Sequence, residues 1–167
     1  MACFEKNLSN LQSLAKHMRR GAFAANEWGL CPDAIVFGWV EQESSWKTYA
    51  TREEPAFYNR YIKDDYAGRR EAWQLAMSWG LLQVMGATAR EMGFEGKYLS
   101  QLCAEPALGL FFGIKYLRHQ KERGDGTWSQ ALAAYNGGLG GNRTAPYRRQ
   151  EYVDGVIRRA RKYAARG

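Results

Sequence analysis

The sequence has 167 residues, of which 46% are hydrophobic and 14% aromatic, and it carries a net charge of +7. This length favours one domain, residues 1–167, because it suffices for a sizeable hydrophobic core but is short for two ordinary domains. No window approaches the ~20 apolar residues of a membrane span, and Met1–Asn7 lacks the basic and apolar segments of an export signal. We therefore expect a globular monomer.

The cysteines and histidines argue against two classes of site. Cys3, Cys31 and Cys103 lie far apart and in no C-x-x-C spacing, so neither a disulfide framework nor a zinc site is indicated. His17 and His119 are the only histidines, which gives little material for a histidine-based metal site or triad. We expect no metal and no cofactor.

Most of the chain shows the apolar spacing of helices. Leucines at three-and-four spacing predict a helix over residues 5–25, and Pro32 suits the first turn of the next, which carries Ile35 to Glu43. Further expected elements are a short helix over about 69–76, a turn or short hairpin over 78–86, a brief helix over 88–93, and helices over 106–123, 127–135 and 150–164. The pattern predicts a mainly α fold with at most a small hairpin.

An irregular, aromatic segment separates the second helix from the hairpin. Its rings stand among charged residues between 48 and 70; they are Tyr49, Phe57, Tyr58, Tyr61 and Tyr66. Aromatic rings stack on the apolar face of a sugar, whose hydroxyls need polar partners. The segment therefore fits a carbohydrate groove, although ordinary loop packing would produce the same composition.

Glu43 is the first candidate for chemistry. If Ile35, Val36, Trp39 and Val40 form the buried stripe of their helix, the 3.6-residue period places Glu43 on the same inward side. Burying an ionised carboxylate without partners costs several kcal/mol, so an inward glutamate has partners or keeps its proton near neutral pH. Glu43 is a candidate general acid, and the alternative is a frayed helix end with Glu43 in water.

The positive charge is concentrated at the C-terminal end. Residues 147–167 hold seven cations against Glu151 and Asp154, which places +5 of the +7 there. The cations of the last helix are Arg158, Arg159, Arg161 and Lys162. A basic helix fits contact with an anionic membrane or lipopolysaccharide, and it also fits an ordinary solvated face. We expect no nucleic acid partner, because no recognised binding motif accompanies the charge.

Three blocks in order resemble the signature of the soluble lytic transglycosylase (SLT) domain, a lysozyme-like fold that cuts peptidoglycan. They are Glu43-Ser44, then residues 80–85 (GLLQVM), then residues 134–138 (AYNGG). Tyr152-Val153 is similar to the family's C-terminal tyrosine block. The resemblance implies a mainly α, lysozyme-like fold and cleavage of the β-1,4 bond between N-acetylmuramic acid (MurNAc) and N-acetylglucosamine (GlcNAc), with a 1,6-anhydromuramoyl product.

The resemblance also implies roles for single residues. Glu43 would protonate the glycosidic oxygen and then, as a carboxylate, take the proton of the sugar's own C6 hydroxyl. Tyr135 would hydrogen-bond and position Glu43. The implied groove residues are Gln83, Met85, Asn136 and Tyr152, with Ser78 for an acetamido group; Ser44 is a further candidate, although its hydroxyl fits a bond to the local backbone better.

A lysozyme-type hydrolase is the alternative within enzymes. Most glycoside hydrolases need a second carboxylate, and related goose-type lysozymes typically have an aspartate where this chain has Met85. Because Met85 cannot activate water, the resemblance favours the transglycosylase. Glu53, Glu54, Asp64 and Asp65 are available as the second carboxylate that a muramidase would need. Glu54 is the foremost of them, and the alternative for it is a solvated loop position.

Two departures from the family pattern bear on function. Arg148 stands where the family usually has a glutamate, four residues before Tyr152, and the gap between the first two blocks is long. These departures leave a non-catalytic wall-binding module open. Without a visible export signal, we expect a phage lysin or virion-associated enzyme acting on the periplasmic wall, or a bacterial enzyme trimmed of its signal.

Overall fold

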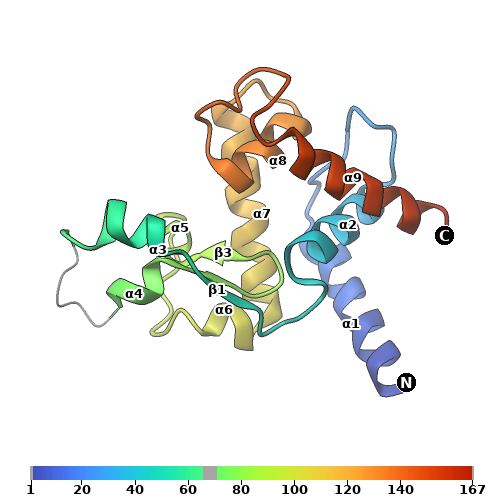
Figure 1. The fold of residues 1–167 in the computed structure, drawn as a ribbon. Coiled ribbons are helices and arrows are strands. Elements are labelled where there is room, and N and C mark those ends of the chain that lie inside the picture. Colours follow the sequence, from blue (N-terminus) through green and yellow to red (C-terminus); the bar gives the residue numbers. More distant parts are fainter. Residues whose placement is uncertain (1, 66–70, 167) are drawn as a thin grey trace.

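A long helix, α7 (Pro106–Arg123), runs through the middle of the molecule, and the other elements are arranged around it (Figure 1). The computed structural model describes residues 2–65 and 71–166, with side chains from Asn7 onward. The larger helices are α1 (Ala2–Met18), α2 (Pro32–Ser44), α7 (Pro106–Arg123), α8 (Trp128–Gly137) and α9 (Gln150–Ala164). Tyr66, Arg69 and the side chain of Cys3, which entered the sequence predictions, lie outside the described part.

Short elements fill the chain between α2 and α7. The helical ones are α3 (Pro55–Phe57), the π-helical turn η1 (Tyr58–Ile62), α4 (Ala72–Leu75), α5 (Gly86–Glu91) and α6 (Gln101–Ala104). The strands are β1 (Thr51–Glu53), β2 (Met77–Trp79) and β3 (Val84–Met85). They form an antiparallel sheet in the order β1-β2-β3, with Arg52 opposite Ser78 and Ser78 opposite Met85. Arg52 and the predicted groove residues Ser78 and Met85 therefore lie side by side across the three strands.

The mainly helical prediction is confirmed, and the hairpin expected over 78–86 is present as β2 and β3. The sheet has one strand more than predicted, because β1 pairs with β2. The first helix is shorter than the predicted 5–25, since α1 ends at Met18. Arg20 (φ 44°), Gly21 (φ 82°) and Phe23 (φ 60°) adopt left-handed backbone conformations that a right-handed helix cannot contain.

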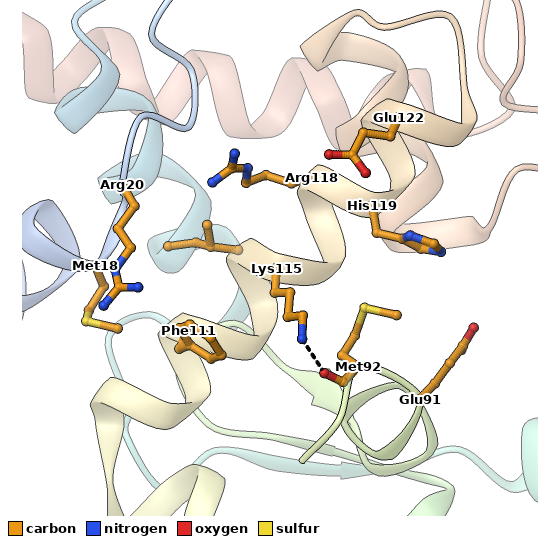
Figure 2. Close-up of a pocket in the computed structure, with 10 residues that line it drawn as sticks. Met18, Arg20, Glu91, Met92, Phe111, Lys115, Arg118, His119 and Glu122 are labelled. Atoms are coloured by element: carbon orange, nitrogen blue, oxygen red, sulfur yellow. Dashed lines mark hydrogen bonds between the residues drawn. The ribbon is translucent and has the colours of Figure 1, made fainter.

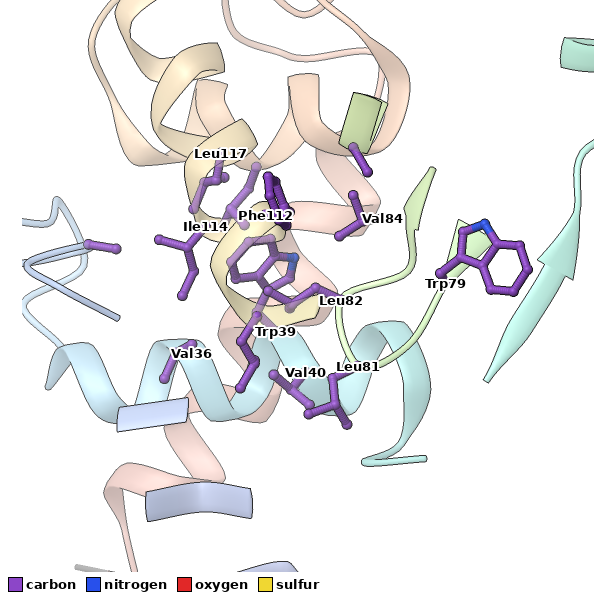
Figure 3. Packing of buried hydrophobic residues seen from close by; sticks show 14 of the residues in the cluster. Val36, Trp39, Val40, Trp79, Leu81, Leu82, Val84, Phe112, Ile114 and Leu117 are labelled. Atoms are coloured by element: carbon purple, nitrogen blue, oxygen red, sulfur yellow. The ribbon is translucent and has the colours of Figure 1, made fainter. Parts of the chain in front are cut away.

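The buried core joins α2, α7 and the β2–β3 connection. Figure 3 shows Trp39 of α2 beside Leu82, with Ile114 and Leu117 of α7 close by. Trp39, Leu82 and Leu117 have no exposed surface. One cluster of buried residues extends from Ala15 to Ala160, while the assignment of residues 1–167 to a single domain stays a prediction. Among the described helices, none is long and apolar enough to span a bilayer.

Helix α9 lies directly against α2 (Figure 1). This contact brings Tyr152 of α9 close to Glu43 of α2. Gly38 permits the close approach, because a Cβ added there would lie 2.5 Å from the backbone nitrogen of Ala160 and 2.7 Å from the carbonyl oxygen of Val156. Backbone atoms of a packed helix cannot move aside independently. The separation of α2 and α9 is therefore set by a glycine.

The variant Gly38→Ala is expected to lower the free energy of unfolding by about 1 to 3 kcal/mol, although alanine is the better helix former. Gly155→Ala is a matched control, since its Cβ would meet the Gln42 side chain at 2.9 Å rather than backbone. Urea unfolding midpoints measure both variants. A Gly38→Ala protein as stable as the control would show that the helices separate without cost.

Candidate functional site

Glu43 lies in the last turn of α2, next to the point where the helix stops. Ser45 ends the helix in a left-handed conformation (φ 51°), and its N–H donates to the carbonyl of Glu41. A left-handed residue at this position is a common helix C-cap, because it lets the backbone satisfy a free helix carbonyl. The Glu43 side chain is half-buried and lines a cavity. The frayed helix end in open water is not what the structure shows.

Two side chains from different helices hold the Glu43 carboxyl group. The Tyr152 hydroxyl of α9 donates to Glu43 Oε1, and the Trp39 Nε1–H of α2 donates to the Tyr152 oxygen over 2.9 Å. Burial raises the pKa of the Tyr152 hydroxyl well above its usual range, and the Glu43 charge raises it further. The Tyr152 hydroxyl therefore keeps its proton near neutral pH and donates it to the hydrogen bond with Glu43.

The surroundings of Glu43 favour its neutral form. Desolvation by burial raises the pKa of Glu43 from 4.5 to about 7, while the hydrogen bond from Tyr152 and the charge of Arg52 act in the lowering direction. Burial wins because it disfavours any charged carboxylate, whereas a single hydrogen bond and a more distant cation offset only part of that cost. A glutamic acid that keeps its proton near pH 7 fits the task of a general acid.

The cavity beside Glu43 has a volume of about 700 Å³ and is bounded by the sheet, α8 and the loop before α9. The predicted site residues that line it are Glu43, Glu54, Ser78, Gln83, Met85, Tyr135 and Asn136. A cavity of this size holds a few sugar rings at most along an open groove. The structure therefore gathers most of the sequence-predicted residues around one carboxyl group.

The residues on the sheet side are fixed by backbone contacts. Gln83 Nε2 donates to the carbonyls of Ala50 (2.9 Å) and Gly80 (3.0 Å), and Gln83 itself has a left-handed backbone (φ 47°). Such a conformation costs of order 1 kcal/mol and persists where surrounding contacts impose it. Ser78 is buried in β2, opposite Met85. These side chains form a rigid wall of the cavity.

Tyr135 differs from its sequence-based prediction. Its hydroxyl donates to the backbone carbonyl of Leu82 over 2.6 Å, so the hydrogen bond expected between Tyr135 and Glu43 is not made in this structure. The ring packs edge-on against Trp39, with centroids 4.9 Å apart, and lies 5.4 Å from the ring of Tyr116. Tyr135 links α8 to the β2–β3 connection. The hydrogen bond to Glu43 that was predicted for Tyr135 is made by Tyr152 instead.

Two further predictions are placed outside the cavity wall. Ser44 is buried, and its hydroxyl donates to the carbonyl of Val40 over 3.2 Å, which is the backbone contact that its helix-end position favours. Tyr152, predicted to contact substrate, does not line the cavity and instead supports Glu43. Asn136 does line it, at the exposed end of α8.

Glu54 lines the cavity but is engaged by a cation. Its Oε1 accepts from Arg52 Nε and lies 2.6 Å from Arg52 Nη2 as well. Arg52 lies in β1, and Glu54 immediately follows the strand. The Glu54 carboxylate is thus occupied by a guanidinium rather than free in the groove. Glu54 therefore lines the groove as the partner of Arg52, whereas Glu43 is held by the Tyr152 hydroxyl.

Several lining residues were not predicted from sequence as site residues. They are Arg52, Phe57, Tyr61, Thr88, Tyr116 and Arg149. A signal for Arg52 was its position two residues before the predicted Glu54, with the opposite charge. Phe57 and Tyr61 belong to the aromatic segment expected to line a carbohydrate groove, and their rings lie 4.9 Å apart in it. Trp39 was assigned only to the core, and nothing in the sequence showed that its N–H reaches Tyr152.

A second pocket of about 450 Å³ lies beside α7 and is shown in Figure 2. Its ionisable groups include Glu91 and Glu122, both exposed, and Lys115, whose Nζ donates to the carbonyl of Met92 over 2.7 Å. It contains no buried acid. Within the described residues, no group of three or more histidine, cysteine, aspartate or glutamate side chains is placed to hold a metal ion. The Glu43 cavity is therefore the candidate active site.

Comparison with known proteins identifies the family and the fold of the chain. The transglycosylase SLT domain matches residues 22–154, which is well over half of the chain. The crystal structure of the 70 kDa soluble lytic transglycosylase SLT70 from Escherichia coli has the same fold, with a TM-score of 0.55 and 18% identity over 89% of this chain. This chain spans 24% of the length of that protein. The mainly α, lysozyme-like fold is thereby confirmed, and the chain belongs to the transglycosylase SLT domain family.

Proposed function

We propose that this protein is a peptidoglycan lytic transglycosylase, which cleaves the β-1,4 bond between MurNAc and GlcNAc and leaves a 1,6-anhydromuramoyl end. The observation that carries this proposal is Glu43, the groove carboxyl group whose pKa is raised to about 7 and which Tyr152 holds in place. Membership of the SLT family supports peptidoglycan as the substrate.

One carboxyl group is enough for this reaction. Neutral Glu43 donates its proton to the glycosidic oxygen, the C1–O bond breaks, and positive charge develops at C1 of the muramoyl sugar. The Glu43 carboxylate then removes the proton of the C6 hydroxyl while the C6 oxygen bonds to C1. Glu43 ends in its starting form, and no water is consumed.

The neighbours of Glu43 suit both of its charge states. When Glu43 is ionised between the two steps, the Tyr152 hydroxyl and the Arg52 charge stabilise the carboxylate. When it is neutral, burial favours the proton. These opposing influences leave the pKa close to the pH at which donation and removal of a proton are both feasible. Tyr152 acts as the positioning residue in this proposal, supported by Trp39.

The groove offers contacts of the kind that a glycan strand needs. Gln83, Met85, Asn136 and Ser78 line the part beside Glu43, and we assign them to substrate binding. Phe57 and Tyr61 extend the lining from the aromatic segment, and Tyr61 is half exposed. An exposed ring at a groove wall stacks on the apolar face of a sugar.

Glu54→Gln separates the proposal from a muramidase. We expect the variant to retain the cleavage rate within about threefold, because Glu54 is paired with Arg52 and the anhydro mechanism has no role for it; a water-activating base would cost about a hundredfold or more. The measurement is the initial rate of glycan cleavage. Glu53→Gln is the matched control, an exposed neighbour on β1 outside the cavity. A severe loss in Glu54→Gln alone would favour the muramidase.

A wall-binding module without catalysis is the rival from another class. Incubation of purified peptidoglycan with the wild-type protein tests it, followed by mass spectrometry of the soluble fraction. We expect soluble muropeptides with 1,6-anhydromuramoyl ends. Sedimentation of the protein with the wall, without release of any fragment, would establish the binding module instead.

The outer face of α9 carries the exposed cations for which the sequence predicts contact with an anionic surface. Arg158, Arg161 and Lys162 are exposed there, whereas Arg159 lies 3.7 Å from the Glu41 carboxylate. We propose contact with anionic lipid or lipopolysaccharide through these exposed cations. Origin as a phage lysin or virion-associated enzyme, and a monomeric state, stay predictions.

A further inference from the structure

Two arginines stand on the wall of the groove immediately before α9. Arg148 and Arg149 line the same cavity as Glu43, and both are exposed. Ion pairs within the described residues use Arg19, Arg52, Arg90, Arg159 and Lys16, and they include neither of these two arginines. Their charges therefore face the groove without a neutralising carboxylate.

The backbone that carries the two arginines is held by a buried asparagine. Asn142 has no exposed surface; its Oδ1 accepts from the Arg149 N–H over 2.9 Å, and its Nδ2 donates to the carbonyl of Gly138 over 2.7 Å. The Arg148 N–H donates to the carbonyl of Gly141 over 2.8 Å. These hydrogen bonds fix the backbone of the loop, and therefore the positions from which the Arg148 and Arg149 side chains extend.

Gly137 gives the Arg149 side chain its path along the groove. A Cβ at Gly137 would lie 2.7 Å from Arg149 Cγ and 2.8 Å from Arg149 Nε, so the Arg149 side chain lies directly against the end of α8. Arg148 Nη2 lies 3.5 Å from the Gly137 carbonyl. Tyr152, the partner of Glu43, follows Arg149 by three residues in the chain, which is about one helical turn.

The positive charge of Arg148 and Arg149 has no role in the proposed cleavage of the glycosidic bond. Arg52 is balanced by Glu54, so Arg148 and Arg149 leave an excess of positive charge among the lining residues. The sugar rings of a glycan strand are uncharged, and the anionic groups of peptidoglycan are carboxylates on the muramoyl substituent. Guanidinium groups pair with carboxylates in a planar, often two-point geometry.

We propose that Arg148 and Arg149 form a carboxylate-binding subsite that recognises the substituent on a muramoyl residue next to the cut. The inference rests on the proposed function and adds a substrate class, namely strands that carry a free carboxylate on that substituent. Two sources share this chemistry: the stem peptide, and the lactyl group that is freed when the peptide is removed.

Binding is measured in the Glu43→Gln background, where the strand stays intact and the result does not depend on the reaction. Three strand preparations are compared by fluorescence anisotropy: strands with stem peptides, amidase-treated strands with free lactyl carboxylates, and strands whose carboxylates are capped with methylamine. Arg148→Gln and Arg149→Gln are added singly and together. Arg143→Gln is the matched control, an exposed loop cation outside the cavity lining.

We expect the double variant to weaken binding of one carboxylate-bearing preparation about five- to tenfold and to leave capped strands within about twofold. The preparation that is affected identifies the source of the carboxylate. Raising the salt concentration should reduce the wild-type preference, because the arginines are exposed. Arg143→Gln should match the parent on all strands.

Equal weakening for all three preparations would overturn the subsite, since it would mean a loss of groove shape rather than of charge recognition. No weakening with any preparation would overturn it as well. The proposed function is assessed separately, by anhydro product formation with Glu43 intact. Its failure would leave the binding comparison unchanged, so the two proposals can fail independently.

Discussion

Glu43→Gln is expected to reduce glycan cleavage by about a thousandfold or more, because glutamine can neither donate the proton to the leaving oxygen nor remove one from the C6 hydroxyl. Its amide still fills the same space beside Tyr152 and lines the same cavity. The measurement is the initial rate of release of anhydromuropeptides from purified peptidoglycan. Rates within tenfold of wild type would show that Glu43 is not the acid.

The same variant should be more stable than the wild type at alkaline pH. Since the pKa of Glu43 is raised from 4.5 to about 7, its favourable contribution is complete below pH 4.5 and is lost as the pH rises through 7. Ionising the buried carboxyl group then costs about 3 kcal/mol. Urea unfolding from pH 4 to pH 9 should show Glu43→Gln gaining on the wild type over this window, with Glu53→Gln as the flat control.

Tyr152→Phe is expected to lower the cleavage rate by about ten- to a hundredfold and to move the alkaline limb of the pH profile upward. The hydroxyl holds Glu43 in place and lowers its pKa, so its removal costs position and raises that pKa further. Trp39 Nε1–H also loses its acceptor, which should cost about 1 to 2 kcal/mol of stability. The measurement is kcat/KM against pH.

Tyr135→Phe is the comparison for this effect. It removes a hydroxyl that is bonded to Leu82, so the alkaline limb should stay at the wild-type position whatever happens to the rate. A limb that moves in Tyr135→Phe and not in Tyr152→Phe would reverse the assignment of the positioning tyrosine.

Helices with a strong apolar face could be predicted from the sequence. The predicted spans 106–123 and 150–164 coincide with α7 and α9, because Pro106 and Gly124 mark one and a continuous inner stripe marks the other. The short elements β1, α3, η1 and α6 have at most five residues each and too little periodicity to be predicted. They take their conformation from the surfaces that they cover.

Most residues of the candidate site could be predicted from the sequence, but the hydrogen bonds between them could not. Glu43 and the groove residues follow from local motifs, whereas the donor to Glu43 depends on how α9 packs across α2. Tyr135 lies near the end of α8 and Tyr152 near the start of α9, and the packing of α9 against α2 brings the Tyr152 hydroxyl to the carboxyl group. Contacts across 109 residues of chain, such as that from Tyr152 to Glu43, carry no local signal.

The central claim is that the C6 hydroxyl, and not water, attacks the muramoyl C1. Digestion of peptidoglycan in water enriched in oxygen-18, followed by mass spectrometry of the muropeptides, tests it directly. The proposed mechanism predicts products with 1,6-anhydromuramoyl ends, each lighter by one water than a reducing end and free of the label. Reducing muramoyl ends that carry one oxygen-18 would contradict it and identify a hydrolase.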